Sequence, residues 1–246
     1  MIKRVFLFIV LLLVICYLVA AVTLFNRRPA GQVCRDVELV IKDTANAGFV
    51  TRSEVTALLQ KKGIYPVGKK VERIHTKTLE RELNKHSLID RTECYKTPSG
   101  KIRIEVRQRV PILRVMNDKG ENYYIDNKGT IMPPDAKCIA HRVIATGNVE
   151  KSFAMRDLYK FGVFLQNNKF WDAQIEQIHV LPGRDVELVP RVGNHIIYLG
   201  KLENTEQKLE RLKVFYEKAL NQVGWNKYSR ISLEFGNQII CTKWGE

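Results

Sequence analysis

The sequence holds only one apolar run that is long enough to cross a membrane. Residues 5–25 carry no charged side chain, and no second stretch in the 246 residues approaches the ~20 apolar residues that a bilayer crossing requires. A multi-span transporter or channel is therefore not expected. The composition, 45% hydrophobic and 27% charged, lies near the globular average and argues against a disordered or collagen-like chain.

The usual catalytic and metal-binding motifs are also missing. No two cysteines have CxxC spacing, the 5 histidines show no HExxH spacing, and there is no GxSxG turn. Residues 63–69 match the start of a phosphate-binding loop, but Lys70 stands where Ser or Thr would hold magnesium, and Pro66 interrupts it. We therefore expect a non-enzymatic protein without cofactor or metal, which works by binding other proteins.

Acidic residues are scarce: 26 acids face 40 lysines and arginines, which gives a formal net charge of +14. The basic residues are scattered among the acids rather than clustered, so we expect no nucleic-acid partner. An anionic membrane surface or a cell-wall polymer would suit an anchored basic domain equally well.

Cysteines are few as well. Four of the 5 lie outside the apolar run, at positions 34, 94, 138 and 241, and they allow three disulfide connectivities. The sequence does not choose among these, and small buried apolar residues are the favoured interpretation.

The apolar run predicts a retained membrane anchor. As a helix, residues 5–25 would span about 31 Å, close to the ~30 Å of a hydrocarbon core. The alternative is a cleaved signal peptide with Val19-Ala20-Ala21 at its cleavage site, but a signal h-region usually has only ~7–15 residues. Two basic residues stand on each side of the run, so charge does not fix the topology.

The first part of the remaining chain indicates a small β-α-α-β-β unit. Thr51 and Glu54 have the capping-box spacing of a helix start, and Pro98-Ser-Gly100 is a turn between two strands. The expected elements are a strand at 37–41, helices from Thr51 and around Leu79, Leu83 and Leu88, and strands at 90–97 and 101–110.

The second part indicates a mixed α/β domain with a largely antiparallel sheet. Turn residues at 117–120 and 126–129 separate short alternating runs, and the helix at 208–223 has the clearest helical spacing of apolar residues. The expected strands are 112–116, 123–125, 130–132, 175–180, 186–189 and 195–199, with a further helix at 155–166.

The chain closes with a predicted hairpin, strands 231–235 and 238–242, around a two-residue Gly236-Asn237 turn. This turn would place Ile240 on the core face and Ile239 with Cys241 on the opposite face. The pairs that it predicts are Phe235 with Gln238, Leu233 with Ile240, and Ile231 with Thr242.

A last strand that is apolar on both faces is unusual where it meets only water. We therefore expect the closing hairpin to bind a partner, unless the helix at 208–223 covers its second face. The expected partner-binding residues are Tyr228, Arg230, Ser232, Glu234, Phe235, Gln238, Ile239, Ile240, Cys241 and Thr242.

Several stretches, in this order, resemble the bacterial cell-division family FtsQ (DivIB). Residues 49–59 (FVTRSEVTALL) are similar to the opening of the family's POTRA domain, and residues 104–112 (IEVRQRVPI) to its strand ending in "V-P". Residues 124–131 (YIDNKGTI) resemble the start of the family's second domain, and residues 231–235 occupy the place of its closing strand.

The resemblance implies a non-enzymatic bitopic protein of the inner (cytoplasmic) membrane at the division septum, with most of the chain in the periplasm. Family members link early and late division proteins and bind the coiled-coil membrane proteins FtsB and FtsL. The POTRA domain helps localisation, and the C-terminal sheet accepts a partner strand.

The resemblance also implies an α+β fold with five segments. These are a cytoplasmic tail at 1–4, a transmembrane helix at 5–25, a linker at 26–35, the POTRA domain at 36–115 and a C-terminal β domain at 116–246. Two alternatives stay open. One is an anchored extracytoplasmic module that binds or processes cell-wall polymer. The other is a POTRA-bearing secretion component of the outer membrane, which would need a downstream barrel that we do not expect here.

Overall fold

The computed structural model describes residues 2–25, 31–42, 48–134 and 140–245. The first helix, α1 (Ile2–Phe25), has a mean hydropathy of 3.3 over Lys3–Val22, and 0% of that span is buried by the rest of the described chain. By length and composition α1 can cross a membrane, which is consistent with the predicted single transmembrane helix.

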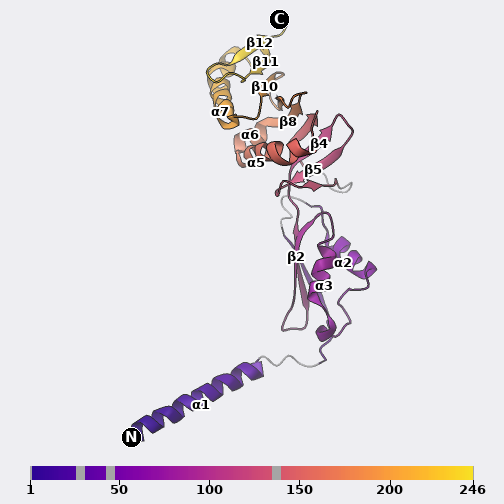
Figure 1. The fold of residues 1–246 in the computed structure, drawn as a ribbon, viewed down its shortest axis with the longest axis vertical. Helices are drawn as coiled ribbons and strands as arrows, with labels where there is room; N and C mark the ends of the chain where they lie inside the picture. Colours follow the sequence, from indigo (N-terminus) through magenta and orange to yellow (C-terminus); the bar gives the residue numbers. More distant parts are fainter. Residues whose placement is uncertain (1, 26–30, 43–47, 135–139, 246) are drawn as a thin grey trace.

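The first domain has the predicted β-α-α-β-β order (Figure 1). Its sheet order is β1-β3-β2, with β1 parallel and β2 antiparallel to β3. The central strand buries every second side chain, Ile102, Ile104 and Val106, in one cluster with helix residues such as Leu59 and Leu83. The elements are β1 (Val37–Lys42), α2 (Arg52–Lys61), the 3-10 turn η1 (Val71–Arg73), α3 (Thr76–Leu83), β2 (Ile89–Lys96) and β3 (Ile102–Gln108).

Local sequence signals explain most of this domain. The predicted capping box starts α2: the Glu54 N–H donates to Thr51 Oγ1 at 3.3 Å, and the Thr51 N–H donates to Glu54 Oε2 at 3.0 Å. The second helix is shorter than expected. It ends at Leu83, and a turn follows in which the His86 N–H donates to the Leu83 carbonyl, so Leu88 is buried beyond the helix rather than within it.

The second domain is a nine-stranded sheet in the order β12-β11-β10-β9-β8-β7-β4-β5-β6. Three neighbouring pairs are parallel and the other five antiparallel, in keeping with the expected largely antiparallel sheet. The strands are β4 (Pro111–Asn117), β5 (Asn122–Asp126), β6 (Ile131–Met132), β7 (Ile144–Gly147), β8 (Ile175–Val180), β9 (Val186–Pro190), β10 (Ile196–Gly200), β11 (Tyr228–Ser232) and β12 (Ile240–Lys243).

Helices cover one face of this sheet. They are α4 (Lys151–Phe153) with a π-helical turn at Ala154–Leu158, α5 (Tyr159–Asn167), α6 (Lys169–Gln174), and α7 (Thr205–Phe215) with a π-helical turn at Tyr216–Leu220 and α8 (Asn221–Val223). A row of paired residues runs beneath them from β4 to β12: Val115, Ala145, Ile178, Leu188, Ile197, Ile231 and Cys241.

The opposite face of the sheet is half-exposed over most of its width. Its central row, next to the buried row on each strand, holds Met116, Thr146, His179, Glu187, Tyr198, Ser232 and Ile240. We call this side the open face, because none of these seven side chains is buried.

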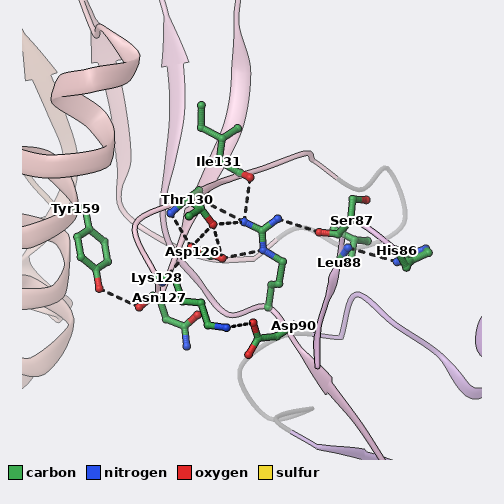
Figure 2. A network of polar contacts seen from close by, with 11 residues as sticks. His86, Ser87, Leu88, Asp90, Asp126, Asn127, Lys128, Thr130, Ile131 and Tyr159 are labelled. Atoms are coloured by element: carbon green, nitrogen blue, oxygen red, sulfur yellow. Dashed lines mark hydrogen bonds and ion pairs between the residues drawn. The ribbon is translucent and has the colours of Figure 1, made fainter. Parts of the chain in front are cut away.

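The two domains meet end to end, at the β5–β6 side of the large sheet (Figure 1). Tyr124 and Met132 belong to the core cluster of the first domain, and the Tyr124 ring packs edge-on against Phe49 with a centroid distance of 5.9 Å. Polar contacts around Asp126 and Thr130 surround this junction (Figure 2). All of β4 pairs within the second sheet, so a domain boundary placed after residue 115 would cut this strand.

The described cysteines form no disulfide with one another. Cys34 and Cys94 are buried, and burial raises the pKa of the Cys94 thiol to about 12. Cys138 lies outside the described residues.

Candidate partner-binding edge

The candidate site is the end of the large sheet at which β12 is the last strand. The chain reaches it through Gly224, whose φ of +93° favours glycine. β11 then runs parallel to β10, and Ile231 pairs with Ile197 in the buried row. β12 pairs with β11 and with no other strand of the described residues. Its outer edge is therefore open to an added strand.

The predicted register of the closing hairpin is wrong by one residue. Ile231 pairs with Cys241 and Ser232 with Ile240, so Leu233 does not face Ile240. β11 ends three residues earlier and β12 begins two residues later than expected, so residues 233–239 form the connection in place of a two-residue turn. One reason is that the Leu233 N–H donates to the Tyr198 carbonyl of β10 at 2.8 Å, which keeps Leu233 with the buried row and away from β12.

Arg211 of α7 fixes the shape of this connection. Its guanidinium donates to the carbonyls of Phe235, at 2.9 Å, and Leu233, at 3.4 Å, and also to the carbonyl of Gly236. Because three carbonyls converge on one cation, the chain curls around the side chain instead of closing in a tight hairpin.

The one-residue shift exchanges the two faces of β12. Ile239 and Cys241 pack against the core beneath the helices, whereas Ile240 is 44% exposed and Phe235 is 47% exposed. The sequence predicts the reverse for Ile239, Ile240 and Cys241, because side chains alternate along a strand and a slip of one residue moves each of them to the opposite face. Burial raises the pKa of the Cys241 thiol, as expected for a thiol on the core side.

Beside Ile240, the open face is polar and ordered. The Arg230 guanidinium lies 2.6 Å from the Glu187 carboxylate and 4.5 Å from the centroid of the Tyr198 ring. Burial, and then the nearby Asp185 carboxylate, raise the pKa of the Tyr198 hydroxyl, so Tyr198 is neutral at physiological pH. A partner strand added to β12 would extend this arrangement by one strand.

On the helix side, a hollow of about 320 Å³ opens next to the start of β12. Val214 and Ile239 give it an apolar wall, and Glu210 and Arg211 of α7 give it charge. An apolar side chain of an added strand could enter this hollow.

The ten expected partner-binding residues do not form one surface. Arg230, Ser232, Ile240 and Thr242 gather on the open face, while Ile239, Cys241 and Tyr228 pack toward the helices. β11 carries Tyr228, Arg230 and Ser232, the connection carries Glu234, Phe235, Gln238 and Ile239, and β12 carries Ile240, Cys241 and Thr242.

Three residues of this site have no clear signal in the sequence: Arg211, Glu187 and Tyr198. Arg211 sits on a predicted helix among many charged residues, and its acceptors lie 22 to 25 positions further along. Only the positions of Glu187 and Tyr198 in alternating strands indicate that they face the same side.

The fold and the site define a two-domain α+β protein with an apolar N-terminal helix and an open sheet edge. In the described part of the chain, no group of three or more His, Cys, Asp or Glu side chains is placed to hold a metal ion. The protein-family model of the POTRA-like domain matches residues 32–107 of the sequence. The model "FtsQ/DivIB, C-terminal related" matches residues 110–242, more than half of the chain, and the chain therefore belongs to the FtsQ/DivIB family.

A curated relative agrees with this assignment. The chain is 25% identical over 179 residues to the cell division protein FtsQ of Rhodothermus marinus, a match that covers 63% of this chain and 61% of that protein. The chain thus aligns with less than two thirds of this relative's length. Membership of the FtsQ/DivIB family implies a role in cell division.

Proposed function

We propose that this protein is a non-enzymatic scaffold of the division machinery, which binds small coiled-coil membrane proteins of the FtsB/FtsL type. The observation that carries the proposal is the open edge of β12. A partner strand there would pair with the β12 backbone, while its side chains would alternate between Ile240 on one face and the hollow beside Ile239 on the other.

Anchoring is the second part of the proposal. α1 crosses the cytoplasmic (inner) membrane once, and the domains after it lie in the periplasm at the division septum. A reporter that is active only in the periplasm, fused after Glu246, should be active. Activity of a cytoplasmic reporter alone would contradict this topology, and release of a mature fragment that starts near Val22 would identify α1 as a signal peptide.

The proposed binding of a partner at the β12 edge is tested by placing a charged side chain on the open face. Ile240→Lys should lower co-purification of the coiled-coil partners with the full chain by at least about tenfold, the size expected for a central contact residue. Because Ile240 is 44% exposed, the fold should tolerate the substitution.

Met116→Lys is the matched control. Met116 is 43% exposed and lies in the same row of the open face, but on β4, six strands away from β12. It should leave co-purification unchanged. Undiminished partner recovery with a folded Ile240→Lys protein would overturn the edge proposal, and binding or turnover of cell-wall fragments in its place would favour a polymer-binding module.

A further inference from the structure

Three segments come together where the chain enters the first domain: residues 31–36, 66–73 and 96–101. The Cys34 N–H donates to the Lys69 carbonyl at 2.9 Å, and the Val71 N–H donates to the Gln32 carbonyl at 2.8 Å. The β2–β3 turn joins them, because the Lys96 ammonium donates to the Glu72 carbonyl at 3.4 Å and Gly100 packs directly against the Gln32 side chain. Figure 1 shows that this end of the first domain points away from the second domain.

This end is strongly basic. Six cations stand in the three segments against two acids, Asp36 and Glu72, and Glu72 also accepts the Gly31 N–H at 3.2 Å. Arg35, Lys70 and Arg73 are exposed, and no ion pair within the described residues neutralises them. We call this surface the basic end; its cations are Arg35, Lys69, Lys70, Arg73, Lys96 and Lys101.

Apolar side chains are exposed among these cations. Val33 is 44% exposed and Val67 is 39% exposed, and apart from Tyr95 they are the only large hydrophobic side chains exposed in residues 31–42 and 48–110. Exposed apolar side chains beside lysine and arginine are typical of surfaces that enter the headgroup region of a membrane.

The anchor limits how far the basic end can be from the bilayer. Six peptide units separate Phe25, the last residue of α1, from Gly31, which is bound to Glu72. At no more than ~3.6 Å per residue they can span at most about 22 Å. With α1 in the membrane, as the proposed function requires, the basic end is therefore held close to the lipid surface.

We propose that the basic end docks on the anionic lipid headgroups of the membrane that holds α1. Each cation near an anionic surface strengthens binding by about fivefold, and added salt weakens the attraction. Docking would set the height and tilt of the first domain, and with it the distance of the β12 edge from the bilayer.

The test uses the full chain in nanodiscs, either of phosphatidylcholine alone or of equal parts phosphatidylcholine and phosphatidylglycerol. A photo-crosslinking amino acid at Val67 should attach to lipid in the anionic discs, with a yield that falls in neutral discs and at high salt. The same amino acid at Val192, which is 48% exposed in the second domain, should stay free of lipid in both.

The triple variant Arg35→Gln, Lys70→Gln, Arg73→Gln should shift the docking equilibrium by about 100-fold toward the undocked state. The matched control replaces three exposed lysines of the second domain, Lys160→Gln, Lys169→Gln and Lys218→Gln, and should crosslink as the parent does. Equal crosslinking yields at Val67 in neutral and anionic discs, or an unchanged yield in the triple variant, would overturn lipid docking. Either result would leave the proposed anchoring by α1 intact. A chain that does not incorporate into either disc would overturn the proposed anchoring and lipid docking together.

Discussion

Arg109 and Asp126 face each other across the junction between the two domains, with Arg109 Nε 2.8 Å from Asp126 Oδ2. Arg109 follows the last strand of the first sheet, and Asp126 ends β5 of the second. The same guanidinium donates to the Ser87 carbonyl at 3.0 Å in the first domain and to Thr130 Oγ1 at 2.6 Å in the second. One side chain therefore ties both domains together.

The first prediction removes the charge of Asp126 while keeping its shape. Asp126→Asn should lower the free energy of unfolding at neutral pH by about 2–3 kcal/mol, because Asp126 is 1% exposed and the substitution leaves the Arg109 cation without its anion. Urea unfolding of the full chain in detergent measures this loss. Asp118→Asn, at an exposed acid, should change the stability little.

The same pair makes stability depend on pH. Burial by itself would raise the pKa of the Asp126 carboxyl, but hydrogen bonds from the Thr130 N–H, the Arg109 guanidinium and the Lys128 N–H hold the pKa below its ordinary value. The stabilisation of the fold by the ionised Asp126 carboxylate is therefore complete above the unfolded-state pKa of about 4. It is lost as the pH falls through the lower folded-state pKa. The stability difference between the parent and Asp126→Asn should shrink as the pH is lowered from about 5; a constant difference would contradict the assignment.

The second prediction concerns the faces of β12. Ile239→Lys should lower the melting temperature of the protein, because Ile239 packs against the core, whereas Ile240→Lys should not. Thermal unfolding followed by tryptophan fluorescence compares the two variants. Equal losses of stability would mean that both side chains are buried.

The third prediction concerns Arg211. Arg211→Met should speed hydrogen exchange across residues 233–239 and weaken partner binding, because three carbonyls lose their common donor. Glu210→Gln, which lines the same hollow, is the control and should leave exchange unchanged. Unaltered protection of these residues would show that the connection holds its shape without the cation.

The fourth prediction places the domain boundary at residues 109–110, between β3 and β4. A fragment of residues 31–110 should unfold cooperatively, because the second domain contributes only Tyr124 and Met132 to its buried core, with Ala140 packed beside them. It should be less stable than the same region in the full chain, as judged by thermal unfolding. A fragment without a cooperative transition would show that the two domains fold as one unit.

The sequence by itself determined the order of most elements, although strand β7 and helix α6 were not predicted from it. The capping box at Thr51 and the turn at Pro98-Ser-Gly100 act within a few residues, so neighbours in the chain are enough to specify them. The same holds for the apolar run of α1, because its length and composition need no tertiary partner.

Only the tertiary structure decided which side chains the site presents. The Gly236-Asn237 signal favoured a tight hairpin, but Arg211 on α7 and the Tyr198 carbonyl on β10 bind the residues around it and shift the register by one. In the same way, Arg109 and Asp126 are 17 residues apart and meet because two separate sheets bring them together. Such contacts depend on elements that are distant in the chain, and their hydrogen bonds and burial outweigh the weaker preference of a two-residue turn.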